Sequence, residues 1–308
     1  MNRSVIMQDI IVRAGCFVAI ILFGYLLRKF GFFKEDDFKI LSKIVIRITL
    51  PASIVYSFSG KEIDPSMLAI TGLGIGAGLI YMFIAWLINR KRGVDKQAFG
   101  IINNSGYNIG NFTMPFVQSF LGPVGVITTS LFDTGNAFIC LGGSYGVAST
   151  IKDKNGFSVK KIVKALVKSV PFDCYVIMTV LCLLHITLPT PVISFAEIIG
   201  NSNAFMAMLM IGVGFKLSGN REQIGSILEI LAVRYGLAVI LAVVFFYLTP
   251  FSSEIKRTLM ILVFAPIPSA APAFTGEVKG DVGLASAVNS ISIVISIVAI
   301  VSILLITL

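Results

Sequence analysis

Apolar stretches separated by short polar turns run along almost the whole chain. Ten of them are roughly 18–26 residues long, which is enough for a helix to cross about 30 Å of hydrocarbon. Their approximate bounds are 9–28, 38–59, 66–89, 97–121, 124–149, 171–188, 192–217, 224–248, 255–276 and 283–307. The pattern predicts an all-α polytopic membrane protein with ten transmembrane helices.

The fourth stretch is interrupted by polar residues where a membrane helix is ordinarily plain hydrocarbon. Between Asn103 and Pro115 it holds four asparagines and two glycines. Proline removes a backbone donor and collides with the preceding turn, so we expect the helix to break near Gly110–Pro115. Protein groups or a water-filled cavity must then satisfy the freed backbone. The ninth stretch has the same character over residues 265–272, which read Ala-Pro-Ile-Pro-Ser-Ala-Ala-Pro.

The longest polar loop divides these stretches into five and five. An odd number of crossings reverses the orientation of the second half, so any repeat must be inverted. We therefore expect a first five-helix repeat at 1–150, a basic cytoplasmic linker at 151–170 and a second, inverted five-helix repeat at 171–308. Interrupted helices in matching positions of two halves indicate the binding site of a transporter.

Composition excludes a soluble globular protein. The chain is 56% hydrophobic and 13% charged, whereas soluble domains carry about 25% charged residues. Its formal charge of +9 does not indicate a nucleic-acid partner, because the Lys and Arg residues lie mainly in the turns between apolar stretches. That distribution is typical of a membrane protein in a lipid bilayer.

Basic residues concentrate in alternate turns. The rich set comprises the segments 28–39, 90–96, 152–168 and 216–221 together with Lys279. The opposite set holds Lys61, Lys256 and Arg257, besides Arg3 and Arg13 near the N-terminus. Because basic turns stay in the cytoplasm, we predict a multi-pass protein of the cytoplasmic (inner) membrane with both termini outside.

The linker contains an amphipathic pattern. Its apolar residues share one helical face, and its lysines lie elsewhere on the helix. The apolar set is Val159, Ile162, Val163, Leu166, Val167 and Val170, and the lysines are Lys160, Lys161, Lys164 and Lys168. Two interpretations fit this pattern, a short helix on the anionic inner leaflet and a solvated basic linker.

Ionisable residues inside a membrane helix cost free energy unless they are paired or hydrated. Those that stand out here are Arg47, Asp133, Glu197 and Arg234. Asp133, with Asn136 nearby, fits either a site for a coupling cation or proton, or a structural pair with an arginine. Arg47 fits either a contact to an anionic substrate or a structural pair.

Nothing in the chain favours catalysis. Gly142–Gly146 matches the GxSxG motif of hydrolases, but it ends an apolar helix instead of joining a strand to a helix. The four cysteines form no CxxC pair, and His185 is the only histidine. We therefore expect no enzyme, no catalytic residue, no metal site and no cofactor.

The two interrupted stretches carry a family resemblance. In the fourth, Asn104 leads through Gly110 to Pro115, and a further glycine follows at position 122. In the ninth, Pro-Ile-Pro-Ser-Ala at 266–270 is followed by Gly-Asp and then Leu-Ala-Ser. The combination resembles the auxin efflux carrier family, which includes plant auxin exporters and bacterial organic-acid permeases.

This resemblance implies that the fourth and ninth helices cross at mid-membrane and that substrate binds beside the crossing. It also implies a mobile transport domain made of helices three to five and eight to ten. Helices one, two, six and seven would form a scaffold, and the motion would be elevator-like. Half-helices that begin at the breaks would direct their positive dipole ends at the site, which suits a carboxylate.

We therefore predict a secondary transporter that moves a small organic anion, a carboxylate, by elevator-like alternating access. The spacing of Asn104, Asn108 and Asn111 places them on one helical face. The expected substrate-binding residues are Asn103, Asn104, Asn108, Asn111, Pro115, Pro268, Ser269, Pro272 and Arg47, and the expected coupling residues are Asp133 and Asn136. The alternative is an anion or solute channel without alternating access, which needs a continuous polar stripe along several helices. Coupling to Na⁺ or H⁺ and assembly as a homodimer stay open.

Overall fold

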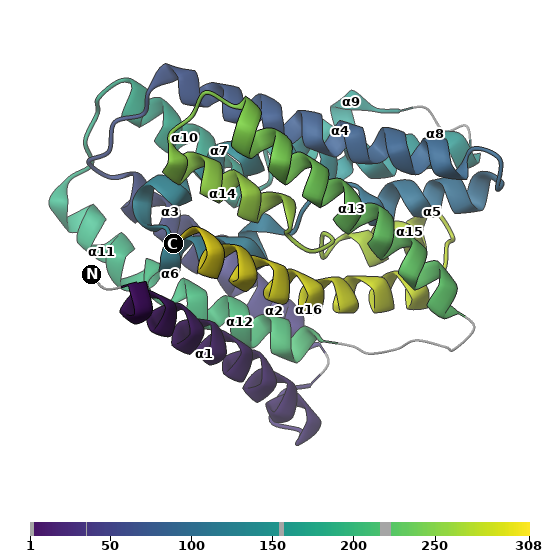
Figure 1. The fold of residues 1–308 in the computed structure, drawn as a ribbon, viewed down its shortest axis with the longest axis horizontal. Coiled ribbons are helices and arrows are strands. Elements are labelled where there is room, and N and C mark those ends of the chain that lie inside the picture. Colours follow the sequence, from purple (N-terminus) through teal and green to yellow (C-terminus); the bar gives the residue numbers. More distant parts are fainter. Residues whose placement is uncertain (1–2, 35, 154–156, 216–222) are drawn as a thin grey trace.

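The fold is a bundle of helices that run back and forth along one axis. The structure, a computed structural model, describes residues 3–34, 36–153, 157–215 and 223–308, and every regular element in these ranges is a helix. Figure 1 shows both termini at one end of the bundle, opposite the turn that joins α4 (Ala69–Asn89) to α5 (Val94–Asn104). The basic positions Lys154, Lys216 and Arg221 lie outside the described residues.

The first half of the chain contains the helices that precede the linker. Besides α4 and α5, they are α1 (Arg3–Lys29), α2 (Asp37–Ile44), η1 (Val45–Thr49), α3 (Leu50–Phe58), η2 (Pro65–Leu68), η3 (Ile109–Thr113), α6 (Met114–Phe120), α7 (Gly122–Phe138), η4 (Ile139–Gly143) and α8 (Ser144–Asp153). Local chemistry explains where they begin. The Asp64 carboxylate accepts the Ser66 N–H at 2.8 Å, and Pro65 occupies the first turn of η2, where its missing N–H costs nothing.

The second half begins in the linker and ends at the C-terminus. Its helices are α9 (Val159–Leu166), α10 (Val170–Leu183), α11 (Thr190–Gly200), α12 (Asn203–Gly214), α13 (Ile224–Leu248), α14 (Ser253–Val263), α15 (Ala271–Glu277) and α16 (Val282–Thr307). Side-chain caps begin several of them. The Asp281 carboxylate accepts the Leu284 N–H at 2.9 Å at the start of α16.

Six helices in the described ranges are long and apolar enough to cross a membrane. They cover Met7–Lys29, Pro65–Asn89, Gly122–Lys152, Thr190–Gly214, Ile224–Leu248 and Val282–Thr307. A seventh is counted if α9 and α10 are taken as one span with a bend of 75°. The chain is therefore an all-α, multi-pass membrane protein, whereas the ten crossings and the inverted repeat stay predictions.

The break in the fourth stretch lies earlier than the sequence indicated. The helix ends at Asn104, and residues 105–108 are unwound, with Gly106 at a positive φ of 76°. The expectation of a break near Gly110–Pro115 is therefore wrong. Pro115 follows a π-helical segment, η3, and lies in the first turn of α6. The chain stays helical through this junction, so the proline does not unwind it.

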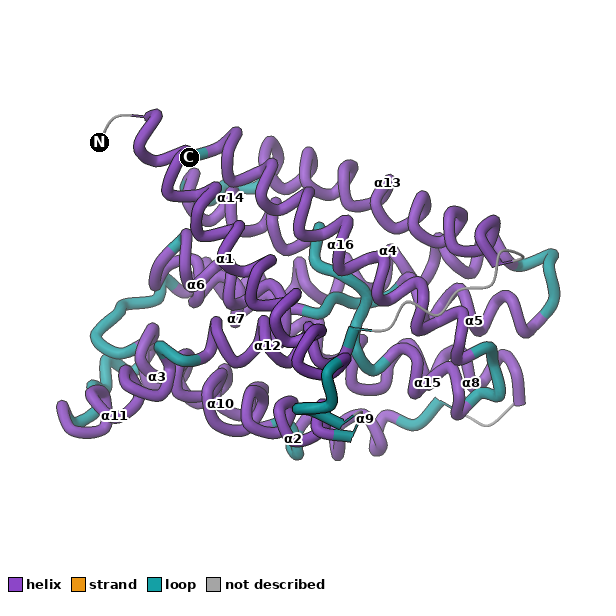
Figure 2. The backbone as a smooth tube through the Cα atoms, turned by 90° about the horizontal axis from the view of Figure 1, so that it is seen from below, coloured by secondary structure: helices purple, strands orange, loops and turns teal. Residues whose placement is uncertain are grey.

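The second break coincides with the predicted proline-rich segment. Residues 264–270 separate α14 from α15, and Pro272 lies in the first turn of α15. Two prolines within the unwound segment, Pro266 and Pro268, lack the N–H groups that a helix needs. Figure 2 shows the two unwound segments as loops in the interior of the bundle, away from its ends.

Candidate functional site

The two breaks meet through their backbones. The Asn108 N–H, at the end of the first break, donates to the Pro266 carbonyl of the second at 2.9 Å. We call the two segments, residues 105–108 and 264–270, the paired breaks. This contact joins positions far apart in the sequence. It also gives a hydrogen-bond partner to an N–H and a carbonyl that lie outside any helix.

Arg234 of α13 holds the paired breaks together. Its guanidinium donates to the Asn104 and Gly106 carbonyls at 2.8 and 3.0 Å, and to the Ala265 and Pro266 carbonyls at 2.7 and 2.9 Å. The side chain has no exposed surface. Four charge-assisted hydrogen bonds to two unwound segments make Arg234 a clamp on the backbone of the site.

Aromatic rings surround the same guanidinium. The carbon at its centre lies 5.6 Å from the centroid of the Tyr81 ring and 5.5 Å from that of the Tyr107 ring. The described ion pairs do not include Arg234. Its positive charge is thus balanced by carbonyl dipoles and ring faces instead of a carboxylate.

Each break is also held by an asparagine of the following long helix. Asn136 of α7 accepts the Tyr107 N–H and donates to the Tyr107 carbonyl, both at 2.9 Å. Asn289 of α16 donates to the Ile267 and Pro268 carbonyls at 2.9 and 3.2 Å. The two breaks are therefore supported in the same manner, each by a side-chain amide that binds its main chain.

Two cavities adjoin the paired breaks. One, of about 320 Å³, reaches α1, α2 and α12, and we call it the α1-side cavity. The other, of about 240 Å³, reaches η1, α3 and α10, and we call it the α10-side cavity. Asn108, Asn111 and Ser269 line both of them. The Asn111 amide donates to the Ser269 hydroxyl at 3.4 Å, while its buried carbonyl oxygen has no hydrogen-bond partner among the described residues.

The remaining walls of these cavities come from two groups of helices. Both cavities have one wall formed by the paired breaks together with α7, α15 or α16. The facing wall is formed by α1, α2 and α12 in one cavity and by η1, α3 and the start of α10 in the other. The polar groups of the breaks therefore lie at a boundary between two sets of helices.

Asp133 lines the α10-side cavity. Its carboxylate accepts the Asn136 amide at 2.8 Å and the Tyr175 hydroxyl at 3.0 Å. Asp133 belongs to α7 and Tyr175 to α10, so this hydrogen bond spans the boundary between the two sets. The described partners of Asp133 are thus an amide and a phenol, and not the arginine that one interpretation of the sequence required.

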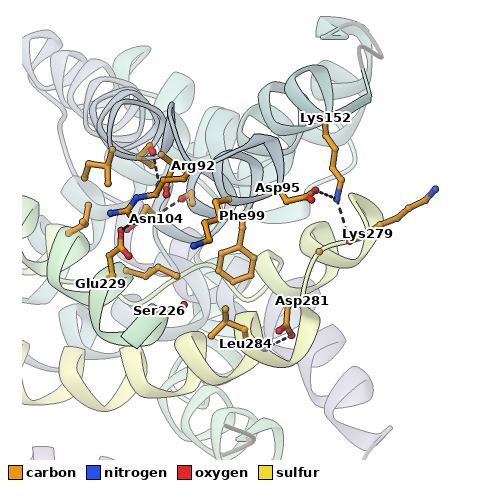
Figure 3. Close-up of a pocket in the computed structure, with 18 residues that line it drawn as sticks. Arg92, Asp95, Phe99, Asn104, Lys152, Ser226, Glu229, Lys279, Asp281 and Leu284 are labelled. Carbon is orange, nitrogen blue, oxygen red and sulfur yellow. Dashed lines mark hydrogen bonds and ion pairs between the residues drawn. The ribbon is translucent and has the colours of Figure 1, made fainter. Parts of the chain in front are cut away.

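Asn104 faces a third cavity. This end cavity, of about 340 Å³, lies between α4, α5, α13 and α16, near the turn from α4 to α5. Figure 3 shows Asn104 near the Arg92–Glu229 ion pair, with the Asp95–Lys152 pair farther along the wall. Asn104 is separated from Asn108 by the break, because Gly106 turns the chain between them. The prediction that Asn104, Asn108 and Asn111 share one helical face is therefore wrong.

The other predicted site residues lie in different surroundings. Pro268 lines the α10-side cavity and Pro272 the α1-side cavity. Asn103 is fully buried and donates to the Thr275 hydroxyl at 3.1 Å and the Phe99 carbonyl at 3.0 Å. Pro115 is buried, Arg47 is exposed, and neither is among the residues that line the three cavities.

Sequence reasoning did not assign three residues that the structure brings to the site. Arg234 was visible as a charge inside an apolar stretch, but no spacing rule connects it to the breaks. Asn289 was visible as an amide inside an apolar stretch, which fits either an interhelical hydrogen bond or the edge of a site, and Tyr175 carried no comparable signal. Among the described residues, no three His, Cys, Asp or Glu side chains come together as the ligands of a metal would.

Comparison with known proteins finds that this chain is similar to transporters. The sequence profile of the family described as membrane transport protein matches residues 14–163. An uncharacterized transporter of Methanothermobacter thermautotrophicus is 25% identical over 126 residues, which covers 40% of this chain and 42% of that protein. An uncharacterized transporter of Methanocaldococcus jannaschii is 24% identical over 261 residues, which covers 82% of this chain and 83% of that protein. The chain thus matches less than half the length of the first of these relatives.

Proposed function

We propose that this chain, which belongs to the membrane transport protein family, is a secondary transporter of a small organic anion that carries a carboxylate. Membership of the family also bears out the resemblance to auxin efflux carriers that the sequence carries. One observation carries the proposal. Polar side chains from both breaks, Asn108, Asn111 and Ser269, line cavities on the boundary between two sets of helices.

The chemistry of these cavities suits an anion. A carboxylate that leaves water must receive hydrogen bonds from the protein, because an unpaired charge in an apolar interior is very costly. Asn108, Asn111 and Ser269 supply neutral donors that cost little to desolvate. The Arg234 guanidinium, which binds the carbonyls behind them, adds a fixed positive charge with no described carboxylate partner.

The placement of the cavities supports alternating access over a channel. A channel needs a continuous polar path, whereas the polar side chains here concentrate at the paired breaks. We propose that helices three to five and eight to ten of the predicted order move against helices one, two, six and seven. The two facing walls of each cavity belong to these two sets. The repeats at 1–150 and 171–308, joined by the linker at 151–170, remain part of this proposal.

Asp133 is proposed as the coupling group for a proton or cation, with Asn136 as its neighbour. Its carboxylate lines the α10-side cavity and binds Tyr175 across the boundary. Loss or gain of a charge at this position changes the interaction between the two sets of helices. A transported acid and a coupling ion therefore meet at one surface.

The test uses Cys140, whose thiol lies in the α10-side cavity and donates to the side-chain amide oxygen of Asn136 at 3.2 Å. A variant in which Cys16, Cys174 and Cys182 are replaced by serine is reconstituted in proteoliposomes with a panel of small mono- and dicarboxylates. We expect saturable uptake and counterflow of one class of acid. That acid is also expected to slow the reaction of Cys140 with a methanethiosulfonate reagent several-fold.

A variant without the four native cysteines that carries Lys91→Cys serves as the control, because Lys91 is exposed in the turn between α4 and α5 and is not among the residues lining the cavities. Its labelling rate should not respond to the acid. Counterflow without protection of Cys140 would place the acid elsewhere in the protein. Flux that neither saturates nor shows counterflow would establish the channel instead.

A further inference from the structure

The linker helix α9 meets the following helix at a steep angle. After α9 ends at Leu166, the chain turns by 75° into α10. Helix α10 contacts α7, which belongs to a segment long and apolar enough to cross the membrane, and it forms most of the sixth predicted membrane helix. With α10 crossing the membrane, a helix that meets it at 75° lies close to the membrane plane and not across it.

One face of α9 is fixed to the protein. Ile162 and Leu166 are buried, and they pack with Ala137, Leu141 and Phe172. These contacts place α9 over the π-helical bend η4 in the fifth stretch. The orientation of α9 about its own axis is therefore determined by the protein, which leaves the rest of its circumference at the surface.

A row of exposed valines lies beside the buried pair. Val159, Val163 and Val167 recur every four residues and are 61%, 49% and 65% exposed. The sequence grouped them with Ile162 and Leu166 on a single apolar face, but the structure separates them into a buried pair and an exposed row. An exposed row of this kind on a surface helix requires an apolar neighbour.

The surface of α9 next to the valine row, on the side away from the buried pair, is basic. Lys160, Lys161, Lys164 and Lys168 are all exposed, and residues 157–169 contain no Asp or Glu. An apolar row beside a basic face, on a helix in the plane of the membrane, matches the boundary between lipid tails and anionic headgroups. A solvated linker would leave the valines in water without compensation.

We infer that α9 lies in the headgroup region of an anionic lipid leaflet. Its valine row enters the upper part of the hydrocarbon, and its lysines bind lipid phosphates. Because α9 packs on η4 and continues into α10, it touches both sets of helices that form the walls of the α10-side cavity. Lipid charge therefore acts on the position of α9 at the boundary between them.

The test measures the depth of α9 in the full-length protein. A spin label is attached to Val163→Cys in a background without native cysteines. The protein is placed in bilayers of phosphatidylcholine alone or of phosphatidylcholine with about 30% phosphatidylglycerol, an anionic lipid that gives the surface the negative charge of an inner leaflet. The measured quantity is the ratio of the label's collision rate with oxygen, which concentrates in hydrocarbon, to its collision rate with a water-soluble nickel complex. With anionic lipid this ratio should increase at least twofold. Combined Lys160, Lys161, Lys164 and Lys168→Gln substitutions should remove most of that difference.

Two comparisons keep the result interpretable. A label at Ile240→Cys, an exposed position of α13, reports a site within the span and should not respond to lipid charge. A milder pair, Lys164→Gln with Lys168→Gln, replaces the fourfold variant if the latter unfolds. A Val163 label that stays in water in both bilayers would overturn the inference and leave α9 as a surface for a soluble partner.

Discussion

Asn103 and Asn111 carry the same side chain on either side of the first break, yet their surroundings differ. Asn103 is fully buried and bridges Phe99 and Thr275, which ties α5 to α15. Asn111 lines both central cavities, and its amide nitrogen donates to the Ser269 hydroxyl at 3.4 Å, which leaves its second N–H for an anion. One amide therefore supports the fold, and the other is available to a ligand.

This difference predicts opposite effects of alanine substitution. Asn111→Ala should weaken binding of the transported acid by about 1–3 kcal/mol, the usual loss when a charged group loses a hydrogen bond, while thermal stability changes little. Asn103→Ala should lower the melting temperature and leave the dissociation constant unchanged, because it orphans buried partners. Both quantities are measured on the same purified variants. A larger loss of affinity for Asn104→Ala would move the acid to the end cavity.

Residue types at the site were largely predictable, but their grouping was not. The asparagines and Ser269 stood out because amides and hydroxyls are rare in plain hydrocarbon. Their grouping depended on helical spacing, and the spacing rule fails at Gly106, whose positive φ ends the helix between Asn104 and Asn108. Arg47 was expected at the site as a charge inside an apolar stretch and Pro115 as a helix breaker, and neither lines a described cavity.

Proline affects the helices of this protein in two ways. Before Pro51 and Pro115 the backbone widens into π-helical segments, Val45–Thr49 and Ile109–Thr113, and the helix continues. Around Pro266 and Pro268 the helix unwinds completely. Sequence alone does not show whether a proline will widen the helix or unwind it, because unwinding also needs partners for the freed carbonyls. Arg234 and Asn289 supply those partners in the second break.

The first break owes its shape to Gly106, which predicts a sharp penalty for a side chain there. In Gly106→Ala the new Cβ would meet a positive φ and lie about 2.5 Å from the Cys140 sulfur. Gly122→Ala is the matched control, since its φ is also positive but no atom lies near the new Cβ. We expect Gly106→Ala to lower stability by about 1–3 kcal/mol more than Gly122→Ala.

Thermal unfolding of the two purified variants measures this difference. Adding Cys140→Ala to Gly106→Ala should recover the part of the loss that comes from crowding, and the part from backbone strain should remain. Equal stability of the two single variants would mean that the first break tolerates a side chain. The break would then not depend on glycine at position 106.

The turns at the two ends of the bundle differ in charge. The turn between α4 and α5 carries three consecutive basic residues, Arg90, Lys91 and Arg92, and lies at the end opposite the termini (Figure 1). The turn between α13 and α14, which contains Phe251, lies at the same end as the termini (Figure 1). The arrangement agrees with the charge asymmetry along the sequence, although the choice of compartment for each end stays a prediction.

Labelling from one side of the membrane tests that choice. Single cysteines at Lys91 and Phe251, in a background without native cysteines, should react from opposite sides. An impermeant maleimide added to intact cells should label the Phe251 variant and reach the Lys91 variant only after permeabilisation. Labelling of both in intact cells would reject the topology. Asn155, an obvious linker position for this purpose, lies outside the described residues.

At this scale the sequence predicted the order of the helices far better than their contacts. Hydrophobic length alone located the apolar helices, including the six that meet the criteria for crossing a membrane. The pairing of the two breaks left no trace of its own in the sequence. It depends on a main-chain hydrogen bond from Asn108 to Pro266 and on a guanidinium from a third helix, and neither follows from periodicity.

The clamp formed by Arg234 has a consequence for engineering this protein. All four of its hydrogen bonds end on main-chain oxygens, and every amino acid presents such an oxygen whatever its side chain. The support of the pocket is thereby independent of the side chains that line it. A library randomised at Asn111 and Ser269 keeps all four hydrogen bonds of Arg234. The proposed selection of an acid by these two side chains can therefore be altered without rebuilding the framework around them.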